Sequence, residues 1–87
     1  MDLVFDIETD GLDATCIHCI VAIDEQDNTY TFDNKNIDEG VDFLKKANKL
    51  IGHNIVGFDI PTIKKLTGVD LYSLHSVVDT LVLSRLF

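Results

Sequence analysis

The spacing of the apolar residues changes from strand-like to helix-like near residue 37, and this change says more about the fold than any other feature. Before it, three apolar segments predict strands over Met1 to Ile7, Ile17 to Asp24 and Thr29 to Phe32. A polar connection of hairpin length, residues 25–28, separates the second segment from the third. The three strands are therefore expected to form an antiparallel meander.

A helix and a fourth strand are predicted next. From Ile37 the apolar residues recur at spacings of four and three, and Asn36 with Glu39 has the form of an N-cap with its capping-box acid. These signals predict a helix over residues 37–48. The short apolar segment over residues 50–53 predicts a strand reached by a crossover and parallel to one of the first three. The chain is therefore expected to be mixed α/β.

Two further helices are predicted in the remainder of the chain. Asp59 and Pro61 open the second, and Gly68 is its expected C-cap. A loop is expected over residues 69–76. Asp79 is then the expected N-cap of a third helix that continues to the end of the chain. The apolar last turn of this helix predicts cover from the remainder of a longer polypeptide or from a second chain.

Composition restricts the class of protein. The 87 residues are 46% apolar and 25% charged, which indicates one globular domain with a packed core. The longest stretch without a charged residue, residues 14–23, is too short for a bilayer helix, and the first twenty residues lack a signal peptide's basic region. We therefore expect no membrane partner and a cytoplasmic protein, in the host cell cytoplasm if the chain is encoded by a phage.

Charge is unevenly divided along the chain. The net charge is −8, which argues against a simple electrostatic nucleic-acid binder. Twelve of the fifteen carboxylates lie in residues 1–42 with a single lysine, whereas six of the seven basic residues lie in residues 43–87. The acidic half could hold divalent cations or keep the surface soluble, and the basic half could meet an anion. Lys64 and Lys65 are expected on the solvated face of the second helix, within possible reach of phosphates.

Cys16 and Cys19 have the C-x-x-C spacing of a zinc half-site or a redox motif. No second pair follows, and the three histidines are scattered along the chain. Both cysteines border or lie within an apolar segment, so we expect them to pack as small hydrophobic residues in a buried strand.

Carboxylates recur where strands are predicted to end. Asp6 and Glu8 are two positions apart and should point to one face, ~7 Å apart at the backbone. Asp59 follows the fourth strand, and it would join them if that strand lies beside the first. Three like charges in one place favour a hard divalent cation. The structural alternatives are a solvated strand end for Asp6 and Glu8 and a helix N-cap for Asp59.

The residues at these positions resemble a known family. Residues 6–12 read Asp-Ile-Glu-Thr-Asp-Gly-Leu, similar to the first motif of the DEDD-type 3'-5' exonucleases. His-Asn at residues 53–54 and Phe-Asp at residues 58–59 resemble their second motif. Ile-His-Cys at residues 17–19 and Val-Asp-Thr-Leu-Val-Leu-Ser-Arg-Leu at residues 78–86 are similar to the proofreading domain of phage-type family A DNA polymerases. The resemblance covers nearly the whole chain.

The resemblance implies a fold and a reaction. It implies a ribonuclease H-like mixed sheet, with three antiparallel strands and a fourth parallel to the first, flanked by helices and incomplete. It also implies hydrolysis of phosphodiester bonds at DNA 3' ends with two Mg²⁺ or Mn²⁺ ions. Asp6 would bridge both ions, Glu8 would bind the ion on the nucleophile side, and Asp59 would hold the other.

Further residues are assigned to the substrate by the same resemblance. Leu12 and Phe58 would wedge and stack the terminal base of a single-stranded DNA 3' end, which suits an enzyme that does not read sequence. The backbone around Thr9 and the side chain of Asn54 would meet the terminal nucleotide, with His53 positioning Asn54.

The third motif of the family, Tyr-x-x-x-Asp or its His equivalent, has no match at the expected distance. His75 and Asp79 have the right mutual spacing but follow Asp59 too closely, so a loop residue and an N-cap are expected. The hypothesis is therefore that residues 1–87 are the N-terminal part of a proofreading exonuclease domain, impaired or inactive alone.

Two non-enzymatic alternatives stay open. The chain could be an acidic interaction module whose carboxylates imitate a phosphate backbone, or a degenerate nuclease fold kept as a scaffold. The first should bind basic proteins without a divalent metal, whereas the exonuclease should gain thermal stability from Mn²⁺.

Overall fold

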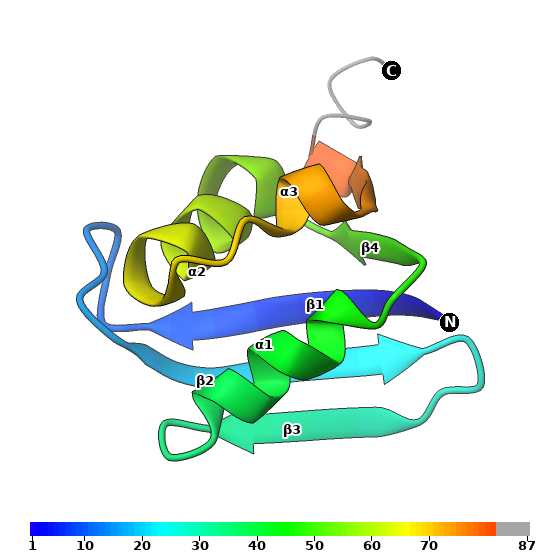
Figure 1. The fold of residues 1–87 in the computed structure, drawn as a ribbon, viewed down its shortest axis with the longest axis horizontal. Helices are drawn as coiled ribbons and strands as arrows, with labels where there is room; N and C mark the ends of the chain where they lie inside the picture. The colour runs from blue at the N-terminus through cyan, green and yellow to red at the C-terminus, as the bar shows by residue number, and fades with distance from the viewer. Residues whose placement is uncertain (82–87) are drawn as a thin grey trace.

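The computed structural model describes residues 1–81, which form a five-stranded sheet with its helices on one face (Figure 1). The elements, in chain order, are β1 (Asp2–Thr9), β2 (Ile17–Asp24), β3 (Thr29–Asp33), α1 (Ile37–Lys45), β4 (Lys49–Gly52), the π-helical turn η1 (Ile55–Asp59), α2 (Ile60–Thr67), α3 (Leu71–Leu74) and β5 (Ser76–Asp79). No helix within the described residues is long and apolar enough to cross a membrane.

The sheet has the order β3-β2-β1-β4-β5. β1 pairs antiparallel with β2, and β2 with β3, whereas β4 runs parallel to β1. The predicted α/β fold, with three antiparallel strands and a fourth parallel to the first, is confirmed. The helix α1 makes the crossover between β3 and β4, as parallel pairing requires.

A fifth strand was not predicted. Residues 69–76 were expected to be a loop, but they contain α3 and the start of β5, which runs parallel to β4. The β-branched pair Val77 and Val78 favours a strand there, although the segment is too short to show alternation. Thr80 and Leu81 are helical, and the rest of the predicted third helix lies outside the described residues.

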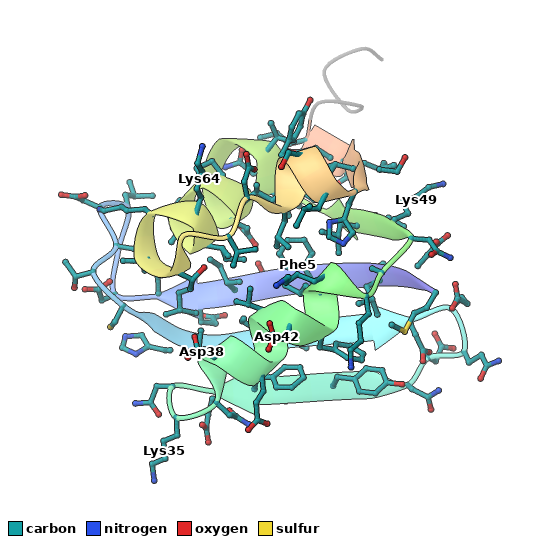
Figure 2. The ribbon with its side chains drawn as sticks, in the orientation of Figure 1. Phe5, Lys35, Asp38, Asp42, Lys49 and Lys64 are labelled. Carbon is teal, nitrogen blue, oxygen red and sulfur yellow. The ribbon has the colours of Figure 1, made fainter. Side chains whose placement is uncertain are left out.

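The hydrophobic core lies between the sheet and the helices. Along β1, Leu3, Phe5 and Ile7 are buried, whereas the residues between them are exposed. This alternation turns one face of β1 toward the helices and leaves the other uncovered. From the helices, buried side chains including Leu44 and Ile63 complete the core. The carboxylates Asp38 and Asp42 lie on the side of α1 turned away from the sheet (Figure 2).

Two local predictions were wrong. Asn36 precedes α1, but its side chain makes no cap hydrogen bond; Asn36 Oδ1 instead accepts from the N–H of Asp33 at 2.6 Å, within the turn after β3. The predicted burial of Cys16 fails as well, because Cys16 is exposed and precedes β2, while Cys19 is half-buried on β2. The C-cap at Gly68 is confirmed, with φ 82° and its N–H bonded to Lys64 O at 2.8 Å.

Candidate active site

The candidate site lies where β4 leaves β1. These two strands pair only from Asp2 to Val4, and β4 ends at Gly52. A Cβ at Gly52 would lie 2.8 Å from the carbonyl oxygen of Phe5, closer than real side chains approach, so glycine is required at this turn. The chain then leaves the sheet through η1, opening the edge of β1 beyond Phe5.

Asp59 fills this opening. Its Oδ2 accepts a hydrogen bond from the N–H of Ile7 at 3.2 Å, and the residue is only 3% exposed. The expected alternative, an N-cap of α2, is wrong, because the Asp59 backbone is helical and its side chain makes no cap hydrogen bond. The side chain instead joins the end of η1 to β1 across 52 residues of sequence.

Burial raises the pKa of Asp59 to about 7. Loss of water around the carboxylate is the largest cause, and the N–H of Ile7 acts in the opposite direction by stabilising the charge. The neighbouring charges of Asp6 and Asp79 raise the pKa further. Asp6 and Asp59 are therefore close enough in space to repel.

Asp6 and Glu8 lie on the exposed face of β1, turned away from the buried Phe5 and Ile7. They share one face, as their spacing predicted. Within residues 1–81, however, no three His, Cys, Asp or Glu side chains are arranged closely enough to hold a metal ion. Asp59 is held at the edge of β1 by the N–H of Ile7, whereas the side chains of Asp6 and Glu8 lie on the exposed face of that strand.

The donor chemistry nevertheless fits a hard divalent cation. Carboxylate oxygens are the ligands that Mg²⁺ and Mn²⁺ prefer. Asp59 is buried with a raised pKa beside a second carboxylate, so a positive charge there would relieve both the desolvation and the repulsion.

The loop between β1 and β2 presents Leu12, which is 94% exposed. Asp10 holds the base of this loop: its carboxylate accepts from the hydroxyl of Thr15 and from the backbone N–H groups of Thr15 and Cys16. These bonds lower the pKa of Asp10 to about 2, and the bond from the Thr15 hydroxyl has the largest effect. The hydroxyl of Thr9 donates to the carbonyl of Gly11 at 2.9 Å. The apolar side chain of Leu12 is thus exposed to solvent on a loop that hydrogen bonds hold in place.

A lysine joins this loop to α2. Lys65 Nζ lies 2.9 Å from Asp13 Oδ1 and 3.0 Å from the carbonyl of Ala14. Lys65 is exposed, as predicted, and it also has a structural partner that was not predicted. Lys64 lies on the outer side of α2 (Figure 2), with Nζ 3.8 Å from Asp70 Oδ2.

The turn after β4 carries the remaining predicted residues. Asn54 is exposed and in the left-handed conformation, with φ 59° and ψ 30°. His53 is exposed, and its Nδ1 lies 3.0 Å from the hydroxyl of Thr80. Phe58 is half-buried against the core, which leaves only part of its ring accessible to a base. The structure therefore places His53, Asn54 and Asp59 on one turn.

Asp79 is the residue whose importance sequence reasoning missed. It was expected to cap a helix, and its Oδ1 does accept from the N–H of Leu81 at 2.9 Å. It also bonds the turn after β4, which was not expected. The available signal was its position directly after the apolar β-branched pair Val77 and Val78.

Comparisons with known proteins agree with this fold. A family model described as RNase_H superfamily matches residues 3–85. No curated protein sequence matches. Among solved structures, the family B DNA polymerase from the hyperthermophilic archaeon Pyrobaculum calidifontis matches with a TM-score of 0.76 and 21% identity, over 99% of this chain. The chain spans only 16% of that polymerase. The family match, together with the mixed sheet and its crossover, shows that this chain belongs to the RNase H superfamily.

Proposed function

We propose that this chain is part of a two-metal-dependent 3'-5' exonuclease of the proofreading type, which hydrolyses phosphodiester bonds at DNA 3' ends. The observation that carries the proposal is the placement of Asp59 on the edge of β1, beside Asp6, where parallel strands β1 and β4 separate. Open α/β sheets bind ligands at this kind of edge. Membership of the RNase H superfamily and a fold shared with a DNA polymerase add support.

In this proposal Asp6, Glu8 and Asp59 hold two Mg²⁺ or Mn²⁺ ions. When bound, such ions lower the pKa of water and stabilise the attacking and leaving oxygens of an in-line displacement. The protein's part is to place its carboxylates: Asp59 is fixed by Ile7, whereas Asp6 and Glu8 are free to turn toward a cation.

The substrate contacts in this proposal come from the loop between β1 and β2 and from the turn after β4. The exposed Leu12 would wedge the terminal base, and the accessible part of Phe58 would stack on it. Asn54 and the backbone at Thr9 would meet the terminal nucleotide, with His53 held by the hydroxyl of Thr80.

The subfamily and the source of the third motif belong to the same proposal. Residues 78–86 resemble the phage-type family A proofreading domain, and the third motif is expected from the remainder of a polymerase chain or from a second chain. A cytoplasmic location goes with this role.

The test uses Mn²⁺ and a single-stranded DNA labelled at its 5' end. The 87-residue chain should melt at a higher temperature in Mn²⁺ at millimolar concentration, and Asp6→Ala should abolish the rise. Asp42→Ala, on the outer side of α1, is the matched control and should keep it. Release of mononucleotides is expected to be slow or absent in the isolated chain.

Two results would count against the proposal. A melting temperature that does not respond to Mn²⁺ contradicts the metal site. Binding to basic proteins without any divalent metal, unaffected by Asp6→Ala, favours the acidic interaction module instead.

A further inference from the structure

Asp79 lies at the carboxyl end of β5, only 6% exposed, and its carboxylate accepts three backbone hydrogen bonds from within residues 1–81. Oδ1 accepts from the N–H of Asn54 at 2.8 Å and from the N–H of Leu81 at 2.9 Å. Oδ2 accepts from the N–H of Val56 at 2.9 Å. Two of the three donors belong to a segment more than twenty residues away, so Asp79 does more than cap the helix that follows it.

The two distant donors lie in the turn that carries the proposed active-site residues. Asn54 has the left-handed conformation, which a non-glycine residue adopts only at a cost, and Val56 is the second residue of η1. Both N–H groups stand near the start of a helical turn, where no earlier carbonyl is available to accept from them. The carboxylate of Asp79 supplies the acceptors that this unusual turn lacks.

The turn is held at both of its ends. Asp79 is level with Gly52 in the register of β4 and β5, and it fixes the beginning of the turn. Phe58 N donates to Asn54 O at 3.0 Å within the turn. At the far end, Asp59 bonds the N–H of Ile7 on β1. The position of Asp59 against β1 therefore depends on a residue two strands away.

We propose that Asp79 is a positioning residue of the active site, which fixes the turn from Asn54 to Asp59 so that the Asp59 carboxylate lies on β1 beside Asp6. Among the residues that the structure describes, its oxygens accept from three N–H groups, and two of these bonds hold the turn after β4. This inference rests on the proposed function for its catalytic meaning, but the hydrogen bonds that carry it are independent of any metal.

A matched control exists in the same chain. Asp70 is also a helix N-cap: its Oδ1 accepts from the N–H of Tyr72 at 3.1 Å, and within residues 1–81 it makes no hydrogen bond to the turn after β4. If Asp79 only capped a helix, Asp79→Asn and Asp70→Asn would have the same kind of effect. The asparagine at position 79 would keep an oxygen but present an NH₂ group to one backbone donor.

The experiment compares the wild-type chain with Asp79→Asn and Asp70→Asn. Amide hydrogen exchange at Ile7, measured by NMR relative to Ile20 on β2, reports whether Asp59 still bonds β1. Electron paramagnetic resonance of free Mn²⁺ gives the dissociation constant of the folded chain. We expect Asp79→Asn to accelerate exchange at Ile7 about tenfold and to weaken Mn²⁺ binding by about tenfold, the low end of the effect of removing a group that orients a metal ligand, because Asp79 acts on Asp59 through the turn. Asp70→Asn should change neither.

The outcomes separate this inference from the proposed function. Exchange at Ile7 and Mn²⁺ affinity both unchanged in Asp79→Asn would overturn the inference. If the wild-type chain binds no Mn²⁺, the proposed function fails, and exchange at Ile7 still decides the role of Asp79. If Asp79→Asn does not fold, the wild-type chain decides: the amides of Asn54 and Val56 must be protected as strongly as the core, and exchange at the unprotected rate refutes the inference.

Discussion

Asp59→Asn in the absence of divalent metal should change how stability depends on pH. The pKa of Asp59 is raised from 3.8 to about 7. Between about pH 4 and pH 7 the folded chain therefore keeps a proton on Asp59, whereas the unfolded chain has already released it. The stability that comes from the neutral carboxyl group is complete below about pH 4. It is lost as the pH rises through about 7, because the folded chain must then bury a charge.

The size of this effect follows from the two pKa values. A tenfold change in the acid dissociation constant corresponds to ~1.4 kcal/mol, so a rise in the pKa from 3.8 to about 7 amounts to about 4 kcal/mol between pH 4 and pH 8. Asparagine removes the charge, and its amide oxygen can still accept from the N–H of Ile7. Asp59→Asn should therefore be more stable than the wild type at pH 8, and the difference should shrink toward pH 4.

The assay is urea unfolding followed by circular dichroism, with a chelator present, at pH values from 4 to 8. The informative quantity is the difference in the free energy of unfolding between the variant and the wild type, because titrations shared by both chains cancel. The pKa of Asp10 is lowered to about 2, so its titration changes the free energy of unfolding mainly below pH 4. A difference that stays constant from pH 5 to pH 8 would refute the argument that Asp59 is buried with a raised pKa.

Two further changes test the packing around the site. Gly52→Ala should lower the free energy of unfolding by about 1–3 kcal/mol, measured by urea titration, because the new Cβ would meet the backbone oxygen of Phe5; a neutral result would mean that β4 can move away from β1. Lys65→Met should cost under about 1 kcal/mol, because its partner Asp13 is exposed. The same variant should speed amide exchange in the loop that carries Leu12, and unchanged exchange would show that Asp10 alone fixes this loop.

Sequence reasoning predicted the first four strands and the helices α1 and α2. This success has a physical basis, because β1 buries alternate residues and α1 buries one stripe, so each pattern has the period of its element. The prediction failed at β5 and α3, each four residues long. Elements of that length do not complete enough periods to be recognised by periodicity; β4 is equally short, but its apolar residues directly follow a predicted helix, which indicated a crossover strand.

The capping predictions show a second limit. Asn36 and Asp59 both have the residue type and position of an N-cap, yet neither side chain bonds the helix that follows it. Each bonds another partner instead: Asn36 the turn after β3, and Asp59 the edge of β1. A side-chain oxygen accepts from whichever N–H the fold leaves unpaired, and for Asp59 that donor is fixed by tertiary structure.

The candidate site depends on the same kind of distant contact. Spacing along the chain indicated that Asp6 and Asp59 would lie near each other if β4 lay beside β1, and the parallel pairing meets that condition. The spacing did not indicate what holds Asp59 in place. The turn that carries Asp59 bonds Asp79, which lies on β5, and the sequence pattern did not predict that strand. Since β5 pairs with β4 and not with β1, a change in β5 should move Asp59 without touching the strand it contacts. The geometry of the site is therefore a property of three neighbouring strands, and a motif taken from any two of them describes it incompletely.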